Sequence, residues 1–240
     1  MRLDKFLTEC GVCSRREAAR CARSGRVLVN GEVCRDGARH IDPEKDRVVF
    51  AGKELCYRRF VYVMLNKPAG LVSATDDARE TTVLSLLPED LRRRELFPCG
   101  RLDKDTTGLL ILTDDGASAH RRLSPRHHAE KTYRFRTLPP LSAADLPVLE
   151  AGVLLDDGYR TLPCRVTADG EDGRGTITLT EGKYHQIKRM MEAVGTRIVE
   201  LERVSFAGIR LDPALAPGSW RYLSPEEEAL FTGEAGPDGP

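Results

Sequence analysis

One segment, residues 98–113, constrains the fold of this chain more than any other. Its first part is a polar turn that is bounded by Gly100 and Gly108 and contains Asp103, and an apolar run, residues 109–112, follows at once. A short apolar run next to a glycine turn predicts a buried strand. The polar side chains of the turn should therefore lie at the edge of a core, where loops anchored to strands often carry catalytic groups. Taken alone, the pattern fits an ordinary Asp-rich turn equally well.

Length and charge leave room for two domains and give no overall sign of a polyanionic partner. The chain has 240 residues, 40% of them hydrophobic, with 37 basic and 37 acidic side chains. That composition can supply one large core or two smaller ones. Residues 1–58 carry 13 basic against 9 acidic side chains, and the remainder carries 24 against 28. The N-terminal part is thus the electrostatic candidate for nucleic-acid contact, although its excess is modest.

Cysteine usage indicates a reducing compartment. The seven cysteines are an odd number, and the first residues are charged rather than apolar, so we expect no secretory signal, free thiols and a cytoplasmic location. Cys10 and Cys13 have zinc-ligand spacing, but no second pair completes a site, and small core residues are the better interpretation. The longest apolar runs are far too short to span a bilayer, so we expect no membrane partner.

Local patterns near the N-terminus predict a compact helix–helix–hairpin unit. Apolar residues in segment 3–10 repeat with helical spacing. Ser14 and Glu17 have the spacing of a capping box, which begins a second helix that Gly25 ends. An Asn-Gly pair between valines, in segment 27–33, is the signal of a β-hairpin.

A stripe of arginines follows the second helix of this unit. Its spacings of four and three place these side chains away from the small alanines of the same helix. On its own the stripe is an ordinary solvated face. Residues 2–5, 14–16 and 25–31 together, however, resemble the S4 domain, a small RNA-binding module. The resemblance implies phosphate contacts, which position an RNA without reading its sequence, by Arg15, Arg16, Arg20 and Arg23.

The remaining chain has the pattern of a mixed α/β domain. We place the S4-like RNA-binding domain at residues 1–56, a linker at 57–60, the second domain at 61–232 and a disordered tail at 233–240. Within the second domain we predict a turn at 66–70, a mobile, substrate-facing loop at 76–95, strands near 61–65, 131–136, 160–166, 176–180, 199–201 and 203–209, and helices near 117–123, 143–151 and 186–194.

Three polar segments of the second domain, residues 100–108, 125–133 and 181–190, are candidates for chemistry. The third lies between a predicted strand and a predicted helix, near a helix N-terminus where anions are favoured. Together the segments offer an acid, a phenol and a cation. A carboxylate in a partly dry pocket needs such a cation, because burial alone raises the pKa of an acid.

Together these segments resemble the pseudouridine synthases of the RsuA type, and with the S4-like unit the resemblance spans nearly the whole chain. The Gly-Arg-Leu-Asp turn implies that Asp103 is catalytic and that Arg101 helps to hold an extruded nucleotide. The Lys-Thr-Tyr motif implies an active-site tyrosine at Tyr133. The His-Gln-Ile-Lys motif implies that Lys188 is the basic partner of the aspartate, beside the apolar Ile187. The family fold implied is a central, mostly antiparallel sheet flanked by helices, with the active site in a cleft.

The resemblance implies isomerisation of a uridine in RNA, with neither cofactor nor metal. The N1–C1′ bond breaks, the base turns and C5 rejoins the sugar, while Asp103 serves as nucleophile or as base. Residues 131–133 favour the small-subunit 16S rRNA enzyme. A large-subunit 23S rRNA enzyme and a non-catalytic S4-type RNA-binding or ribosome-assembly protein are the alternatives. We expect a monomer whose partner is ribosomal RNA or a ribosome assembly intermediate.

Other interpretations of the polar residues carry less weight. Asp103 with Asp105, or the adjacent acids at 114–115, form pairs that suit a divalent metal, but such pairs are common on turns and no phosphate-binding glycine loop accompanies them. The adjacent histidines at 127–128 more often pack or contact an RNA backbone, and they stay outside the catalytic set.

Overall fold

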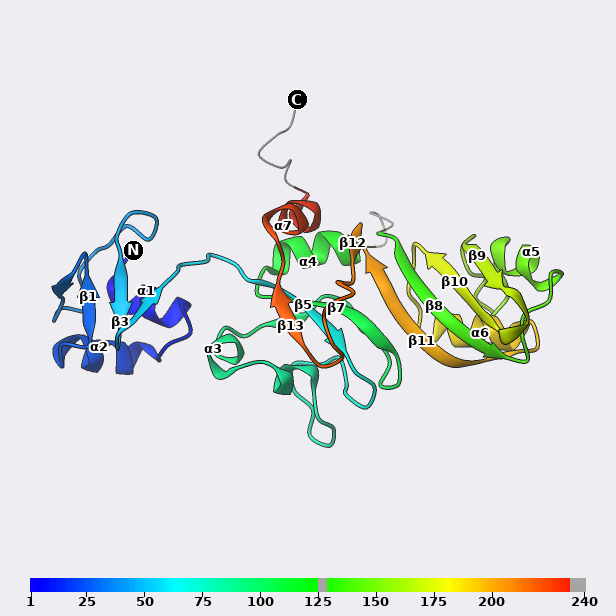
Figure 1. The fold of residues 1–240 in the computed structure, drawn as a ribbon, viewed down its shortest axis with the longest axis horizontal. Coiled ribbons are helices and arrows are strands. Elements are labelled where there is room, and N and C mark those ends of the chain that lie inside the picture. The colour runs from blue at the N-terminus through cyan, green and yellow to red at the C-terminus, as the bar shows by residue number, and fades with distance from the viewer. Residues whose placement is uncertain (125–128, 234–240) are drawn as a thin grey trace, which may run out of the picture. The chain divides into compact units, whose positions relative to one another are not determined.

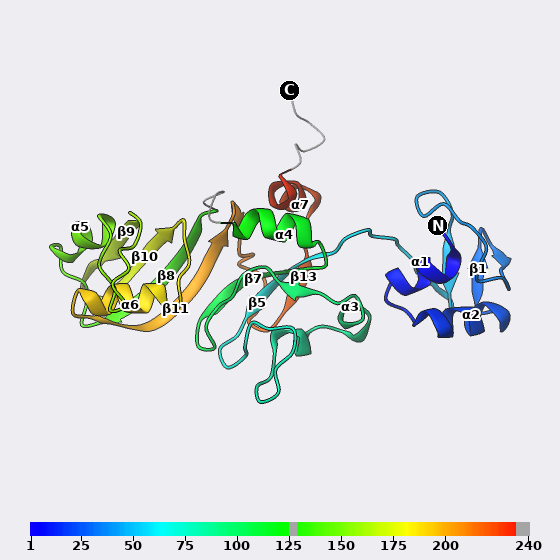
Figure 2. The ribbon, with the colours of Figure 1, turned by 180° about the vertical axis from the view of Figure 1, so that it is seen from behind.

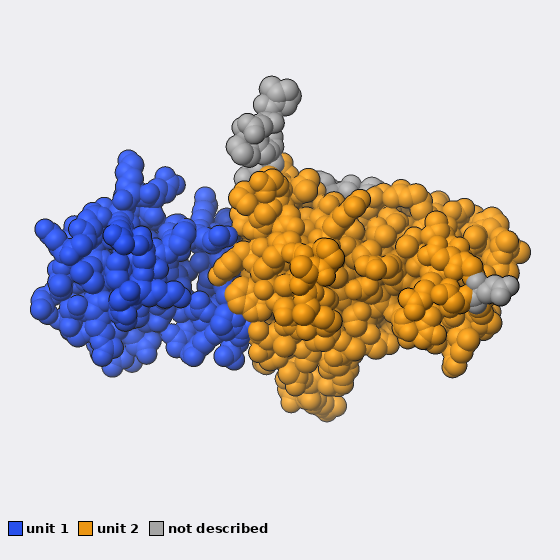
Figure 3. Space-filling view, viewed as in Figure 1, with its two compact units in different colours: residues 1–61, 87–96 blue, residues 62–86, 97–240 orange. Residues whose placement is uncertain are grey.

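The computed structural model describes residues 1–124 and 129–233, and its chain divides into two compact units. Unit 1 comprises Met1–Val61 together with Leu87–Leu96, and unit 2 comprises Tyr62–Leu86 and Phe97–Pro240 (Figure 3). The polar tail expected at 233–240 lies outside the described residues apart from its first member. Each unit has its own sheet and its own buried core.

Unit 1 contains the expected helix–helix–hairpin arrangement. Its four-stranded sheet is antiparallel throughout, in the order β2-β1-β3-β4. The elements are α1 (Leu3–Glu9), α2 (Arg15–Arg23), β1 (Val27–Val29), β2 (Glu32–Val33), β3 (Val48–Phe50) and β4 (Lys53–Leu55), with a short α3 (Glu89–Arg92) from the second segment of the unit.

Two local signals in unit 1 work as the sequence predicts. The Glu17 carboxylate accepts from the Ser14 backbone N–H at 2.9 Å and the Ser14 hydroxyl accepts from the Glu17 N–H at 3.4 Å, so the capping box begins α2. In the β1–β2 hairpin Asn30 and Gly31 both have positive φ, 54° and 86°, as a two-residue turn of this hand requires.

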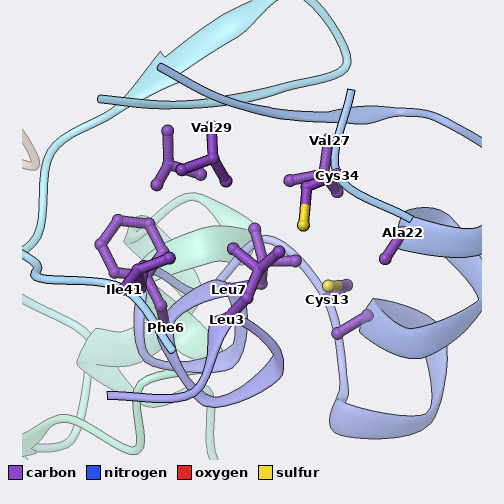
Figure 4. Close-up of a cluster of buried hydrophobic side chains, with 11 residues drawn as sticks. Leu3, Phe6, Leu7, Cys13, Ala22, Val27, Val29, Cys34 and Ile41 are labelled. Atoms are coloured by element: carbon purple, nitrogen blue, oxygen red, sulfur yellow. The ribbon is translucent and has the colours of Figure 1, made fainter. Parts of the chain in front are cut away.

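The core of unit 1 forms between α1 and β1 (Figure 4). Leu3, Phe6 and Leu7 on α1 face Val27 and Val29 on β1, and all five are buried. Two cysteines, at positions 13 and 34, are buried in the same cluster, and those at 10 and 21 pack against it. Small core residues are therefore the right interpretation of these thiols.

The segment Leu87–Leu96 joins unit 1 and contains helix α3, although residues 76–95 were expected to form a mobile, substrate-facing loop of the second domain. Arg94 Nη1 donates to the Glu9 carbonyl at 2.6 Å, and Arg93 Nη1 donates to the Val12 carbonyl at 3.2 Å. At Gly11, a Cβ would lie 2.2 Å from a backbone oxygen of this segment. Only glycine allows so close an approach. Long-range bonds to main-chain carbonyls leave no periodic pattern in a sequence, which is why the grouping was not predicted.

Unit 2 is built on one large, mostly antiparallel sheet, which confirms the predicted fold class. The strand order is β13-β5-β7-β11-β8-β10-β9, with β12 on β11 and β6 on β7, and among the described strands only β7 and β11 pair in parallel. The strands are β5 (Tyr62–Lys67), β6 (Phe97–Pro98), β7 (Thr107–Thr113), β8 (Lys131–Leu138), β9 (Arg165–Asp169), β10 (Arg174–Leu179), β11 (Arg197–Phe206), β12 (Ile209–Arg210) and β13 (Trp220–Tyr222).

Helices flank this sheet in two groups (Figures 1 and 2). Next to β5 and β7 are α4 (Gly116–Leu123) and α7 (Pro225–Thr232), whose buried Ala119 and Phe231 join the core around Ile111. Beside β8–β11 are α5 (Asp145–Glu150) and α6 (Gln186–Ala193). The described residues of the unit also include two short 3₁₀ turns, Val83–Leu86 and Gly170–Asp172. None of the described helices is both long and apolar enough to cross a bilayer.

Three predicted element boundaries are wrong. The turn expected at 66–70 begins later, because Asn66 and Lys67 continue β5 and are buried. The two strands expected at 199–201 and 203–209 are one strand, β11, interrupted by bulges. The strand expected from residue 160 begins only at Arg165. In each case tertiary pairing overrides the local pattern.

Candidate active site

The turn at residues 100–108 leads into β7, and the pairing of β7 with β11 positions it. Gly108 has φ +95°, and a Cβ there would lie 2.3 Å from the Arg203 carbonyl oxygen. Glycine at this position therefore permits the parallel pairing of β7 with β11. The pairing fixes where the turn leaves the sheet, and so fixes the position of Asp103.

The same turn is restrained by Gly70, Ser73 and Glu80 of unit 2, whose contacts with it we call the clamp. Ser73 is buried, and its hydroxyl donates to the Leu102 carbonyl at 3.0 Å while accepting from the Leu102 N–H at 3.1 Å. The Gly70 N–H donates to the Lys104 carbonyl at 2.7 Å, and the Lys104 ammonium binds both carboxylate oxygens of Glu80. The clamp restrains the backbone on both sides of Asp103.

Lys67 completes the clamp from the end of β5. The side chain is fully buried, and Nζ donates to the carbonyls of Asp103, Lys104 and Thr106 at 3.1, 3.2 and 2.8 Å. Burial lowers the pKa of Lys67 to about 8, against the opposing effect of Asp105 and Asp103. Sequence reasoning placed this lysine in a turn and did not single it out. Its one signal was a lysine at the end of an apolar run.

The predicted partners Asp103 and Lys188 meet across the site. Lys188 Nζ lies 3.1 Å from Asp103 Oδ2, and it also bonds both oxygens of Asp105 at 2.6 and 2.9 Å. Burial alone would lower the pKa of Lys188, but its bonds to Asp105 and Asp103 outweigh that effect and raise it. For Asp105, the interaction with Lys188 outweighs burial and lowers the pKa of the carboxyl. One cation therefore serves two carboxylates.

The start of α6 positions this cation. The Gln186 side chain accepts from the Lys183 N–H at 2.8 Å and donates to Glu181 at 2.7 Å, which fixes the turn before the helix. His185 has a left-handed conformation, with φ 49°, and its Nε2 lies 3.6 Å from Asp103 Oδ1. Sequence reasoning did not single out His185, because a histidine in a turn gives no spacing signal.

A cavity of about 570 Å³ joins these elements within unit 2. Alternation along β8 buries Tyr133 on the covered face of the sheet, and Ile187 is buried at the start of α6, whereas Arg101 is exposed at the rim. The residues predicted to form the catalytic and substrate-binding set all line this cavity: Asp103, Tyr133, Lys188, Arg101 and Ile187.

Two further cations, Lys131 and Arg203, line the cavity from β8 and β11. Arg203 is 1% exposed and pairs across the sheet with Tyr133, and its Nε donates to the Leu109 carbonyl at 2.8 Å. Its Nη2 has no hydrogen-bond partner among the described residues. Lys131 Nζ donates to the Ala129 carbonyl at 3.0 Å, and burial, with the neighbouring Arg203, lowers its pKa. This part of the wall is cationic and largely desolvated.

Comparison with known proteins decides the family. Residues 61–193 match the family model for RNA pseudouridylate synthase, and residues 1–48 match the S4 domain. The chain belongs to the RNA pseudouridine synthases of the RsuA type. The resemblance read from the motifs is therefore confirmed.

The relatives of this synthase match it over almost their whole length. It is 46% identical to an uncharacterized RNA pseudouridine synthase of Bacillus subtilis (strain 168), over 96% of this chain and 98% of the relative. It is 45% identical to ribosomal small subunit pseudouridine synthase A of Yersinia pestis, over 95% and 97%. A solved crystal structure of pseudouridylate synthase is 36% identical, with a TM-score of 0.68, over 96% of this chain and 99% of that one.

The structure also places the other candidate residues of the synthase. The four arginines proposed to contact RNA, Arg15, Arg16, Arg20 and Arg23, are exposed on α2, while Ala18 and Ala22 are buried on its other side. Asp115 accepts from the Ala117 and Ser118 N–H groups and from the Tyr62 hydroxyl, so it caps α4. The histidine pair at 127–128 lies outside the described residues.

Proposed function

We propose that this synthase converts one uridine of small-subunit 16S ribosomal RNA to pseudouridine, with Asp103 as the reacting carboxylate. The observation that carries the proposal is the 3.1 Å ion pair between Asp103 and Lys188 in a cavity that Tyr133 also lines. The ammonium stabilises the negative charge of a carboxylate that must act on the sugar. Asp105, bonded to the same ammonium, is the more exposed of the two acids.

The reaction is an isomerisation, and its atoms balance without an added reactant. The N1–C1′ bond breaks, and the uracil leaves with the electron pair as an anion. Asp103 either attacks C1′ or removes a sugar proton. After the base rotates, a bond forms between C5 and C1′, and at that point the Asp103 oxygen leaves C1′ on the first route or Asp103 returns the proton to the sugar on the second. C5 then loses its proton and N1 gains one. Arg203, which is buried, and Lys131, which is half-buried, are cations on the cavity wall, where their charge favours the negative charge of the departing uracil.

Tyr133 and Arg101 are suited to holding the nucleotide. A uridine must leave its stack before the enzyme can reach its sugar, which costs roughly a few kcal/mol. Stacking of the base on an aromatic ring is worth about 1–3 kcal/mol, so Tyr133 offsets much of that cost. Ile187 provides an apolar contact beside the base, and the exposed Arg101 reaches the phosphate backbone at the rim.

The choice of small-subunit RNA rests on the relatives and on residues 131–133. The Yersinia pestis relative carries small-subunit synthase in its name, and so does the 43% identical protein of Escherichia coli (strain K12). The exposed arginines of α2 supply phosphate contacts. We infer that the enzyme acts in the cytoplasm as a monomer, on ribosomal RNA or on an assembly intermediate.

Mapping pseudouridines in ribosomes from a strain that lacks this gene tests the proposal. We expect one 16S site to disappear, to return with the wild-type gene and to stay absent with Asp103→Asn. A site that vanished from 23S RNA would favour a large-subunit enzyme instead. If no site changed, a binding-only function in ribosome assembly would be the better account.

A further inference from the structure

Tyr184 is the most exposed large hydrophobic side chain in the described part of the molecule, at 78%. It lines the mouth of the active-site cavity. Its ring stacks on the His185 ring, with 3.8 Å between centroids and 17° between planes. The imidazole covers one face of the phenol ring, and the high exposure leaves the other face to solvent.

The backbone that carries Tyr184 is held in place. Arg189 Nη1 donates to the Tyr184 carbonyl at 3.4 Å, and its guanidinium is ion-paired with Asp156 and, at 2.7 Å, with Asp157. The turn is closed on its other side by the bond from the Lys183 N–H to Gln186. An exposed aromatic ring on a fixed turn loses little conformational entropy on binding a flat partner.

The surroundings of the ring favour a nucleic acid over an apolar partner. The cavity mouth carries Lys183, Lys104 and Arg101, and the Lys183 ammonium lies 4.4 Å from the centre of the Tyr159 ring. Cations interleaved with aromatic rings are the arrangement that binds single-stranded RNA, by stacking on bases and contact with phosphates.

We propose that Tyr184 is a stacking platform for an unpaired nucleobase next to the uridine that enters the cavity. The inference rests on RNA being the substrate, as in the proposed function. Extruding one nucleotide leaves its neighbour without a stacking partner, and the open face of Tyr184 replaces the lost contact. The binding subsite thereby extends beyond the target nucleotide.

Tyr184 is also linked to Asp103, through His185. His185 stacks on Tyr184, and its Nε2 lies 3.6 Å from Asp103 Oδ1. His185 holds this place with φ 49°, a left-handed conformation that is unfavourable for a residue other than glycine. A base on Tyr184 would sandwich the phenol ring and hold His185 against Asp103. Tyr184 is thus a positioning residue for the site as well as a contact for RNA.

A fluorescent probe tests the platform without requiring the chemical step. The probe is a short single-stranded RNA with one uridine flanked on both sides by 2-aminopurine, whose fluorescence falls when it stacks. We expect binding to the wild-type enzyme to quench it. Tyr184→Ala should remove most of that quenching and weaken binding by roughly 5- to 150-fold, the range that corresponds to the loss of one base stack.

Two control variants and a second probe decide the outcome. Tyr184→Phe should keep the quenching, because it keeps the ring, and so should Tyr222→Ala, which removes an exposed tyrosine outside the cavity. Replacing one flanking base by an abasic nucleotide should weaken the wild type but not Tyr184→Ala. Equal quenching and affinity for wild type and Tyr184→Ala would overturn the platform, even where pseudouridine mapping upholds the proposed function. If the wild-type enzyme failed to bind the probe at any concentration, that result would contradict both the stacking role of Tyr184 and the proposal that RNA is the substrate.

Discussion

Helix α2 of unit 1 and the turn at 100–108 of unit 2 both carry side chains that we propose to be functional, but they hold them in opposite ways. The arginines of α2 project from one regular helix that its own capping box begins, and all four are exposed. Asp103 depends instead on side chains from distant parts of the chain: Lys67 donates to its carbonyl, Lys188 pairs with its carboxylate, and Ser73 bonds to the adjacent Leu102 main chain. Helix α2 presents several similar side chains side by side, whereas the turn forms a single site with side chains from elsewhere in unit 2.

The difference has an energetic consequence. Exposed charges that share no partners act nearly independently, so each contributes a small part of RNA affinity. Groups that act as a unit are strongly non-additive, so removing one of them removes most of the function. Substitutions in unit 2 should therefore slow the chemical step steeply, and substitutions on α2 should weaken binding gradually.

Lys188→Met should have the largest effect among the supporting residues. It leaves Asp103 and Asp105 close together without their shared cation, and we expect the single-turnover rate to fall by about 10²- to 10³-fold. Lys188→Arg, which keeps the charge, should recover part of the rate. A Lys188→Met enzyme as fast as the wild type would show that the ion pair is not part of the chemistry.

Lys67→Met should lower the stability of unit 2 and also slow the reaction. The change leaves buried carbonyls of the Asp103 turn without their donor, and we expect the free energy of unfolding to fall by about 2–4 kcal/mol. Urea denaturation measures this. Lys104→Met is a matched control, because the Lys104 ammonium is half exposed and pairs only with Glu80 in the described region. If both variants unfolded at the same urea concentration, the buried bonds of Lys67 would contribute no more than the exposed Lys104–Glu80 pair.

The difference in unfolding free energy between wild type and Lys67→Met should depend on pH, and this dependence gives a second test of Lys67. The pKa of Lys67 is lowered from its usual 10.5 to about 8 in the folded protein. Between these two values the unfolded chain binds more protons, so this group adds stability as pH rises from about 8 to about 10.5. We expect the gap in unfolding free energy between wild type and Lys67→Met to widen over that range. A gap that narrowed would mean that the folded protein raises the pKa instead.

Arg16→Ala should have the smallest effect. It removes one exposed phosphate contact, so RNA affinity should fall a few-fold and the dependence of log K on log salt should flatten by about 1. The rate at saturating enzyme should not change, and Arg16→Lys should bind like the wild type. A slow chemical step in Arg16→Ala would contradict the separation between α2 and the catalytic turn.

Sequence reasoning succeeded where structure follows from neighbours along the chain. The Ser14 and Glu17 capping box and the Asn30-Gly31 hairpin are local devices, and both form as predicted. The motif residues that line the cavity were also identified in advance, because the motifs name them even though they lie far apart.

What sequence reasoning missed depends on partners that no local pattern encodes. Lys67 and Arg203 bond to main-chain carbonyls, which every residue possesses, so no pairing can be inferred from residue types. His185 gains its place beside Asp103 from a single left-handed residue at the start of α6. The segment Leu87–Leu96 groups with unit 1 through arginine bonds of the same main-chain kind.

The most direct test compares the two carboxylates that share Lys188. Asp103→Asn and Asp105→Asn make the same change in the side chain, and each replaces one negatively charged partner of the Lys188 ammonium with a neutral amide. In single-turnover pseudouridine formation on 16S RNA, we expect Asp103→Asn to slow the reaction at least about 10⁴-fold and Asp105→Asn by about 10-fold or less. Comparable rates for the two variants, or a greater loss with Asp105→Asn, would contradict the assignment of Asp103 as the reacting group.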